Sequence, residues 1–470
     1  MSKQIRLNAF DMNCVGHQSP GLWAHPLDRS DEYNTLKYWT DVAQILERGL
    51  FDAIFLADVL GVYDVYQGNV DAALEQSTQL PVNDPALVVP AMALVTKHLG
   101  FGLTATLSYE TPYTFARRIS TLDHLTQGRV GWNIVTGYLN SAAKGAGMTG
   151  QNAHDDRYAI AEEYMEVVYK LWEGSWADDA VQRDRGRRVF TDAGKVRKVQ
   201  HEGRHYKVDA YHLCEPSPQR TPVLYQAGAS HTGKDFAAAH AECVFIAGPS
   251  KKVTSARVAD IRRRAAALGR DPAEILIFTL MTVIVAETDE AAHAKYEEYR
   301  RYASYDGAMA LVGGWTGIDF SQYDPDEPIR HVKNDAIQSA VEAFTVDDPD
   351  KVWTVREFAE FAGIGGLGPV IVGAPERVAD ELIGWVEDTD IDGFNLAYAL
   401  SPGSFEDFVN YVVPELQRRG VYKTEYAPGT LREKLYGRGP RLAEHHPSAQ
   451  FRFPVAAAVS APEPALAWLE

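Results

Sequence analysis

The chain has 470 residues, of which 46% are hydrophobic and 23% charged, so it can bury a large core. Lys and Arg number 46 against 64 Asp and Glu, and the formal net charge of -18 disfavours nucleic acid and anionic membranes as partners. Three widely spaced cysteines form neither a disulfide framework nor a zinc motif, and no apolar run has the length of a membrane helix or a secretory signal. We therefore expect a cytoplasmic protein.

Two strands and two helices are predicted within the first hundred residues. The apolar runs at 5–10 and 51–57 are typical of buried strands, and Asp58 follows the second run. Residues 33–48 place apolar side chains at helical spacing. Another helix is expected to open at Asp84-Pro85, because Asp is a favoured N-cap and Pro a favoured first helical residue.

Residues 101–138 carry the clearest pattern in the chain. The apolar runs 101–107 and 130–135 flank an amphipathic segment, 112–125, which predicts one β-α-β unit. Both runs end in small or hydroxylated residues. Because ligands bind at the C-terminal ends of parallel strands, this unit is expected to supply part of the site.

The same alternation continues to the C-terminal part of the chain. It predicts further strands at 222–226, 243–247, 275–286 and 393–399, and helices at 154–172, 234–240, 251–268, 290–302, 375–387 and 405–419. About eight strands alternating with helices close most naturally into a (β/α)8 TIM barrel. An open doubly wound sheet is the alternative, but no Gly-rich dinucleotide fingerprint or Walker A motif is present.

One domain is expected over residues 1–447, with two insertions. Residues 174–221 are polar and irregular, which is typical of a surface insertion. Residues 303–368 are rich in Gly, Asp and Pro, and a long insertion of this kind is usually functional, as a lid or an interface. Its Trp315 is a candidate to line the site. From Ser448 to residue 470 the chain is rich in Ala and Pro, and we expect it to be disordered.

The predicted strand ends bring together residues that are polar and mostly uncharged. They are Asp58, Thr104-Ala105-Thr106, Thr136, residues 227–231 and Asn395. The chain shows no glycosidase-like carboxylate pair, no nucleophile elbow and no metal-binding cluster. A site with so little acid, base or metal chemistry of its own indicates that a cofactor carries the reaction.

Three of the candidate residues have a structural and a functional interpretation. Ser230 lies in the segment AGASHTGK between a strand and a helix start, which is either an anion site or an ordinary turn with a Ser cap. Asp58 either binds a polar ring edge or caps the next element. His17, in a polar loop, is either an acid or base or a solvated histidine.

At these residues the sequence resembles the luciferase-like flavin monooxygenases. The motifs LERGLFDAIFLAD, STLDHLTQGRVGWNIVT, HDDRY, CEPSPQRTPVLYQAGAS and DGFNLAYA carry the likeness, which runs from about residue 5 to 435. They are similar to the branch that contains nitrilotriacetate monooxygenase component A and dibenzothiophene sulfone monooxygenase. NAFDMNCV, ADVLGVYDVY and GGWTGIDF add a nearer likeness to dimethyl sulfide monooxygenases. Riboflavin lyase belongs to the same broad group.

The resemblance implies a TIM barrel that uses reduced FMN (FMNH2), supplied by a separate NAD(P)H-dependent flavin reductase, and O2. It further implies that a flavin peroxide attacks the substrate, and that the protein is a homodimer or homotetramer. The implied cofactor-binding residues are Asp58, Thr104, Ala105, Thr106, Thr136, His154, Tyr158, Ala229 and Ser230. A non-prolyl cis peptide is expected at Thr104–Ala105, and His17 is the candidate for steering the peroxide or the substrate.

Several functions remain open on the sequence. Oxidative C–S cleavage of a small organosulfur compound, similar to dimethyl sulfide, is the first. Cleavage of a larger heterocycle such as riboflavin, to lumichrome and ribose, is the second. A flavin-binding protein without catalysis and a deazaflavin-dependent oxidoreductase are further alternatives. One departure bears on this choice: Trp23-Ala24-His25-Pro26 stands where relatives commonly carry Trp-Arg-His-Pro. The lost Arg either opens the barrel mouth for a larger or less polar substrate or is neutral.

Overall fold

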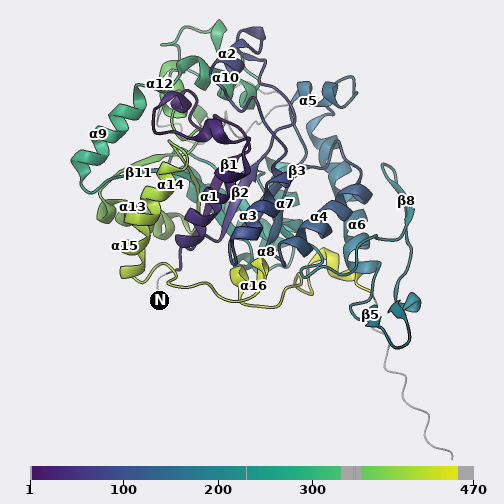
Figure 1. Ribbon diagram of the computed structural model, residues 1–470. Coiled ribbons are helices and arrows are strands. Elements are labelled where there is room, and N and C mark those ends of the chain that lie inside the picture. Colours follow the sequence, from purple (N-terminus) through teal and green to yellow (C-terminus); the bar gives the residue numbers. More distant parts are fainter. Residues whose placement is uncertain (1–2, 229, 330–341, 343, 346–350, 454–470) are drawn as a thin grey trace, which may run out of the picture.

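The structure is a computed structural model, which describes residues 3–228, 230–329, 342, 344–345 and 351–453. Its centre is a closed barrel of parallel strands (Figure 1). Around the ring the strands are β1 (Arg6–Met12), β2 (Ala53–Ala57), β3 (Gly100–Thr106), β4 (Val130–Val135), β9 (Val223–Gln226), β10 (Cys243–Ile246), β11 (Leu276–Val285) and β13 (Gly393–Ala397). Because β13 pairs with β1, the ring closes, and the open doubly wound sheet is excluded.

Helices cover the outside of the barrel, as the sequence pattern predicts. They are α1 (Leu36–Arg48), α3 (Val89–Val95), α4 (Pro112–Leu125), α6 (His154–Gly174), α7 (His231–His240), α8 (Lys251–Ala267), α13 (Pro375–Thr389) and the pair α14 (Gly403–Asp407) and α15 (Val413–Arg418). Their apolar faces pack on the outward side chains of the strands and form the main core. The architecture is therefore a (β/α)8 barrel.

Aromatic side chains fill the part of the barrel interior that lies toward the N-terminal ends of the strands. Phe55, Tyr225, Phe245 and Phe278 belong to one buried cluster, in which the rings of Tyr225 and Phe245 stack with centroids 5.3 Å apart. The short helix α16 (Leu431–Tyr436) closes the N-terminal end of the barrel with two further leucines of that cluster. With this end filled, space for a ligand remains at the C-terminal ends of the strands.

Several helices begin at a different residue from the predicted one, because a capping side chain fixes the first turn. The helix predicted from residue 33 begins at Leu36, because Thr35 accepts a hydrogen bond from the Tyr38 N–H as its N-cap. The helix predicted from residue 234 begins at His231, with Ser230 as N-cap. Asp84 caps only a short 3-10 turn, and α3 starts a few residues later at Val89.

One strand of the central sheet is absent from the predicted elements. β12 (Val370–Gly373) pairs in parallel with the C-terminal half of β11, outside the closed ring. The ten residues of β11 are long enough to pair with β13 along one part and with β12 further on. Along residues 370–373, partly buried and fully buried residues alternate, whereas the barrel strands are buried almost continuously.

The two insertions have regular structure of their own. Residues 174–221 contain two antiparallel hairpins, β5 (Val181–Asp184) with β6 (Val189–Thr191) and β7 (Val199–Glu202) with β8 (Lys207–Ala210), which project from one side of the barrel (Figure 1). The second insertion follows α9 (Asp289–Arg300) and contains α10 (Tyr305–Thr316) and α12 (Val355–Ala362). Parts of its residues 330–350 lie outside the described residues.

A second, smaller core lies over the C-terminal end of the barrel. It joins α10 and α12 to α2 (Asp71–Glu75) and to the loops that follow β2 and β4; the loop after β4 contains α5 (Asn140–Gly145). Tyr63, Leu139 and Trp315 belong to this core. The 303–368 insertion thus covers the end of the barrel where ligands are expected.

Two further expectations require correction. Within the described residues, cis peptide bonds precede Pro81 and Pro402 only, so the predicted cis peptide at Thr104–Ala105 is wrong. The reason is visible in the sheet, since β3 keeps its regular pairing with β4 through Thr106. The disordered tail was expected from Ser448, but residues Pro447–Phe451 form a 3-10 turn beside α6. Residues 454–470 lie outside the described residues.

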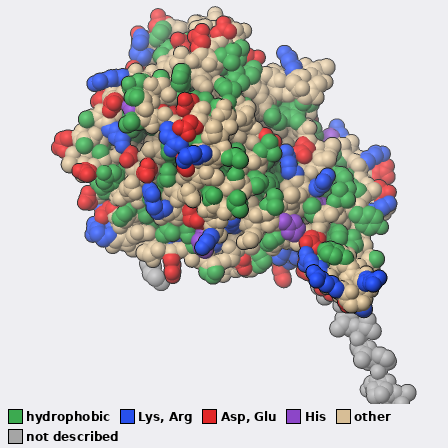
Figure 2. Space-filling view, viewed as in Figure 1, with side chains coloured by type: hydrophobic (Ala, Val, Ile, Leu, Met, Phe, Trp, Pro, Cys, Tyr) green, Lys and Arg blue, Asp and Glu red, His purple; other side chains and the backbone are tan. Residues whose placement is uncertain are grey.

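The surface shows no separation of charge on the visible face. Acidic and basic side chains are interspersed there (Figure 2). Among the helices of the described part, none combines the length and the apolar composition that crossing a membrane requires.

Candidate functional site

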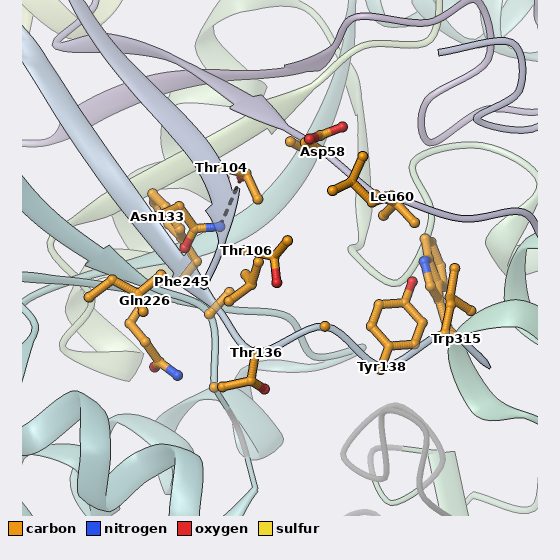
Figure 3. A pocket seen from close by; sticks show the side chains of 18 of the residues that line it. Asp58, Leu60, Thr104, Thr106, Asn133, Thr136, Tyr138, Gln226, Phe245 and Trp315 are labelled. Carbon is orange, nitrogen blue, oxygen red and sulfur yellow. Dashed lines mark hydrogen bonds between the residues drawn. The ribbon is translucent and has the colours of Figure 1, made fainter. Parts of the chain in front are cut away.

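A cavity of about 310 Å³ opens at the C-terminal ends of the barrel strands (Figure 3). Most of the residues predicted for the site lie on its wall: His17, Asp58, Thr104, Thr106, Thr136, His154, Tyr158 and Ser230. Ala105 does not line this cavity, because side chains alternate along β3 and Ala105 points the other way; its carbonyl accepts from Trp132 Nε1 at 2.9 Å. Ala229 lies outside the described residues.

The floor of the cavity carries amide groups with spare hydrogen-bonding capacity. Asn133 on β4 stands beside Thr104 on β3, and its Nδ2 donates to Thr104 Oγ1 at 3.0 Å (Figure 3). Asn133 Oδ1 and Asn395 Oδ1 are buried and have no hydrogen-bond partner among the described residues. Buried polar atoms normally have partners. These two oxygens are therefore placed to accept from a ligand.

One end of the cavity is suited to an anion. Helix α7 begins there, and Ser230 Oγ accepts from the Gly233 N–H at 3.1 Å, a bond that does not use the Ser230 hydroxyl proton. A Cβ on Gly233 would lie 2.7 Å from the Tyr158 hydroxyl and 2.9 Å from Ser230 Oγ, so only glycine leaves both groups room. The two interpretations of Ser230 are compatible, since one atom caps the helix and still faces the cavity.

Three side chains of α6 complete this end. The His154 ring lies 5.2 Å from the Tyr158 ring, one helical turn away. Arg157 is buried, lines the cavity and donates from Nη1 to the Gly137 carbonyl at 2.6 Å. Burial raises the pKa of Tyr158, while hydrogen bonds with Ser230 and Gln226 oppose the rise. The tyrosine therefore stays a neutral hydrogen-bond donor.

Asp58 lies at the end of β2, on the cavity wall (Figure 3). Its burial raises the pKa of the carboxyl to about 7, and the negative charge of Asp84 adds to the rise. The Val59 N–H and the Arg118 guanidinium oppose it. Asp58 is therefore divided between its neutral and charged forms near pH 7, and it can donate or accept a hydrogen bond there.

The raised pKa of Asp58 predicts a pH-dependent contribution to stability. Between pH 4 and about 7 the native carboxyl keeps a proton that the unfolded chain has lost, so the contribution is fully present in acid and lost as pH rises through 7. As pH rises from 4.5 to 8, the free energy of unfolding of Asp58→Asn should increase by roughly 1–3 kcal/mol relative to that of the wild type. Urea unfolding of both proteins measures this. Asp11, whose pKa burial also raises to about 7, is common to both and cancels. A pH-independent difference would contradict the prediction.

His17 is buried, so the interpretation as a solvated loop histidine is wrong. Its ring packs edge-on against Phe10 with centroids 4.5 Å apart, and its Nε2 lies 3.1 Å from Gln18 Nε2. Burial lowers the pKa of His17 to about 3, although the backbone of Phe10 favours the charged form. The imidazole is therefore neutral at physiological pH. It can position a ligand or accept a hydrogen bond, but it does not act as a cationic acid.

The side of the cavity away from α7 is an aromatic wall. Trp315 Nε1 donates to the Tyr63 hydroxyl at 3.2 Å, and this hydroxyl donates to Gln79 Oε1 at 2.8 Å. The Tyr138 hydroxyl lies 3.0 Å from that of Tyr63, and Tyr138 and Trp315 lie close together in Figure 3. Trp315 thus lines the cavity, as expected from the sequence, and links the 303–368 insertion to the loops after β2 and β4.

The segment Trp23–Pro26 does not lie at the cavity. His25 is buried between the rings of Tyr299 and Tyr302, at centroid distances of 5.4 and 4.8 Å. None of these four residues is on the cavity wall. The departure at Ala24 therefore does not open the barrel mouth, which favours the neutral interpretation.

Several wall residues are absent from the predicted site, among them Asn133, Arg157 and Gln226. Asn133 is in the middle of an apolar run, where one polar residue was a usable signal. Arg157 lies within HDDRY, between the two residues that were selected. Gln226 is the last residue of its strand, and its Oε1 has no partner within the described part of the chain.

The chain belongs to the luciferase-like monooxygenase family, whose model matches residues 10–392. It is 55% identical over 453 residues to dimethyl-sulfide monooxygenase from Hyphomicrobium sulfonivorans, covering 96% of this chain and 94% of that protein. It is 48% identical to long-chain alkane monooxygenase from Geobacillus thermodenitrificans, covering 96% and 99%. These relatives are monooxygenases, and so is this protein.

Solved structures agree with the barrel. The crystal structure of DmoA from Hyphomicrobium sulfonivorans superposes with a TM-score of 0.90 at 54% identity, covering 98% of this chain and all of that one. A crystal structure of riboflavin lyase with modified FMN and riboflavin also gives 0.90, at 38% identity, covering 96% of this chain and 100% of that one.

Proposed function

We propose that the protein is a monooxygenase that uses reduced FMN and O2 to cleave the C–S bond of a small compound similar to dimethyl sulfide. The observation that carries the proposal is the shape of one continuous cavity. It joins an anion-binding end at α7 to an amide-bearing floor and to a compact aromatic wall. The 55% identity to dimethyl-sulfide monooxygenase supports the substrate class.

The residues present fit a flavin mononucleotide. Ser230, Tyr158 and the free N–H groups at the start of α7 suit its phosphate, and the room beside Gly233 suits the approach of its oxygens. The unpartnered oxygens of Asn133 and Gln226 suit N–H or hydroxyl donors of the ring and the ribityl chain. Bound reduced FMN would supply the electrons that reduce one atom of O2 to water while the other atom enters the substrate.

The protein's own residues position the cofactor and the substrate and exclude water from them. The aromatic rings of Phe10 and Phe245 and the covering insertion keep the reacting atoms away from solvent. Asp58 presents a carboxyl that exchanges a proton near pH 7 at the cavity wall. Neutral His17 presents a polar ring without a positive charge.

A separate NAD(P)H-dependent reductase is part of the proposal. One relative, nitrilotriacetate monooxygenase component A from Aminobacter aminovorans, is 36% identical, and the designation "component A" supports a second component. A cytoplasmic location and a homodimer or homotetramer are proposed with it, on the same family likeness.

Cleavage of riboflavin is the second candidate. The TM-score of 0.90 to riboflavin lyase favours it. The compact aromatic wall argues for the smaller substrate.

Single-turnover reactions distinguish these functions. The protein would be mixed with photoreduced FMN, oxygenated buffer and one compound at a time, and the products identified by mass spectrometry. The panel contains dimethyl sulfide, a long-chain alkane, dibenzothiophene sulfone, nitrilotriacetate and riboflavin. We expect conversion of dimethyl sulfide that requires both reduced FMN and O2. Conversion of riboflavin instead would support the second candidate, and failure to bind reduced FMN would refute the cofactor assignment.

A further inference from the structure

The cavity contains a region that the flavin-binding residues do not use. We call it the aromatic lobe, and it is formed by Tyr63, Gln79, Tyr138, Leu139, Ala142 and Trp315. In Figure 3, Tyr138 and Trp315 lie together on the side away from Gln226 and Thr136. The role of this lobe rests on the proposed function, because a flavin at the α7 end and on the floor leaves the lobe for the substrate.

The polar groups of the lobe are hydrogen-bonded to one another or to the neighbouring main chain. The Tyr63 hydroxyl gives its proton to Gln79 Oε1, so the Tyr138 hydroxyl, 3.0 Å away, must donate to Tyr63. Trp315 Nε1 also donates to Tyr63, and Gln79 Nε2 donates to the His17 carbonyl at 2.8 Å. Apart from the second Nε2 proton of Gln79, these donors already have acceptors, and the lobe presents mainly ring faces and methyl groups to its contents.

The lobe also has no charge with which to meet an ion. None of its six residues is charged, and the neighbouring His17 is neutral because burial lowers its pKa to about 3. A carboxylate placed here would lose its hydration and gain no cation, with the second Nε2 proton of Gln79 as the N–H donor left to meet it, which is strongly unfavourable.

The position of Tyr63 depends on one glycine of α10. A Cβ on Gly314 would lie 1.9 Å from Tyr63 Cδ1 and 2.6 Å from Cγ, so the ring packs directly on the helix backbone. Cγ lies next to the main chain and cannot move away as the tip of a long side chain can. The adjacent Gly313 is different, since the atoms nearest to its Cβ would be the Ile318 carbonyl oxygen at 3.2 Å and two atoms of Tyr66 at 3.7 Å.

We propose that the aromatic lobe is a substrate subsite selective for compact, uncharged molecules, and that Gly314 is the positioning residue that sets its size through Tyr63. Adding a methyl group at position 314 displaces the Tyr63 ring from the helix. The displaced hydroxyl cannot keep its bonds to Gln79, Tyr138 and Trp315 together, and the shape of the lobe changes.

The test compares Gly314→Ala with Gly313→Ala, two identical substitutions on one helix. For each variant and for wild type, kcat/KM is measured with dimethyl sulfide and with dipropyl sulfide. We expect the ratio of the two values to change at least about tenfold in Gly314→Ala and less than about twofold in Gly313→Ala. This ratio does not depend on the fraction of folded enzyme, so a merely structural effect leaves it unchanged.

A second comparison tests whether the lobe rejects a charged molecule. Dissociation constants of ethyl methyl sulfide and of (methylthio)acetate are measured by saturation-transfer NMR on the wild-type protein and on the Gly314→Ala and Gly313→Ala variants, with no turnover required. We expect the anion to bind at least about 100-fold more weakly. Equal binding of the two compounds would overturn the proposed selectivity.

The outcomes separate this inference from the proposed function. If reduced FMN fails to bind, the proposed function fails, while the NMR constants for both glycine variants still test the lobe. If sulfides are oxidised but both alanine variants show the wild-type substrate ratio, the role of Gly314 is refuted and the proposed function stands.

Discussion

Reduced FMN should bind the double variant Ser230→Ala/Tyr158→Phe at least about 100-fold more weakly than it binds the wild type. Both hydroxyls face the anion end of the cavity, and Gly233 keeps the space between them open. A hydrogen bond to a charged group contributes about 1.5–3 kcal/mol, so losing two corresponds to a factor of about 100 or more. Equilibrium titration under anaerobic conditions measures the affinity.

Riboflavin, which lacks the phosphate, provides the decisive control. Its affinity should be the same within about twofold for the variant and the wild type, because the lost bonds are assigned to the phosphate. Tyr169→Phe is the matched protein control, since Tyr169 is another buried tyrosine of α6, whose hydroxyl bonds to His240 at 3.0 Å away from the cavity. Equal weakening of FMN and riboflavin would show that the two hydroxyls do not bind the phosphate.

Arg432→Met should lower the free energy of unfolding by about 3–5 kcal/mol. Arg432 on α16 is fully buried and donates to both oxygens of Glu242, at 2.7 and 2.9 Å, and to the carbonyls of Thr221 and Pro222. Its removal leaves the buried Glu242 without its cation and the carbonyls without donors. It also loosens the helix that closes the N-terminal end of the barrel.

Two further variants make the stability measurement specific. Arg438→Met removes a half-exposed arginine just after α16 that pairs with Glu274, and it should cost less than about 1 kcal/mol. Adding Glu242→Gln to Arg432→Met should recover part of the loss, because the unpaired charge is removed. Chemical denaturation of the three proteins checks both points. Equal costs for Arg432 and Arg438 would mean that burial does not determine the effect.

Local sequence patterns are enough to predict the barrel and the end of it at which the cavity lies. The helix 112–125 and the strand 130–135 were predicted to the residue, because apolar spacing and the preceding turn residues are local properties. Once the strands are parallel and closed, residues at their C-terminal ends must meet. For this reason Asp58, Thr104 and Thr136 come together although no pattern places them side by side.

The environment of each side chain in the cavity depends on contacts that form only in the folded protein. Trp315 and Tyr63 are 252 residues apart, and their hydrogen bond exists only because the insertion folds back over the barrel. The polar neighbours of His17 in sequence favour a solvated side chain, but the rings that bury it and lower its pKa come from the folded barrel. Burial, pKa and the fit of a ring against Gly314 depend on contacts between distant segments, and local spacing carries no information about those contacts.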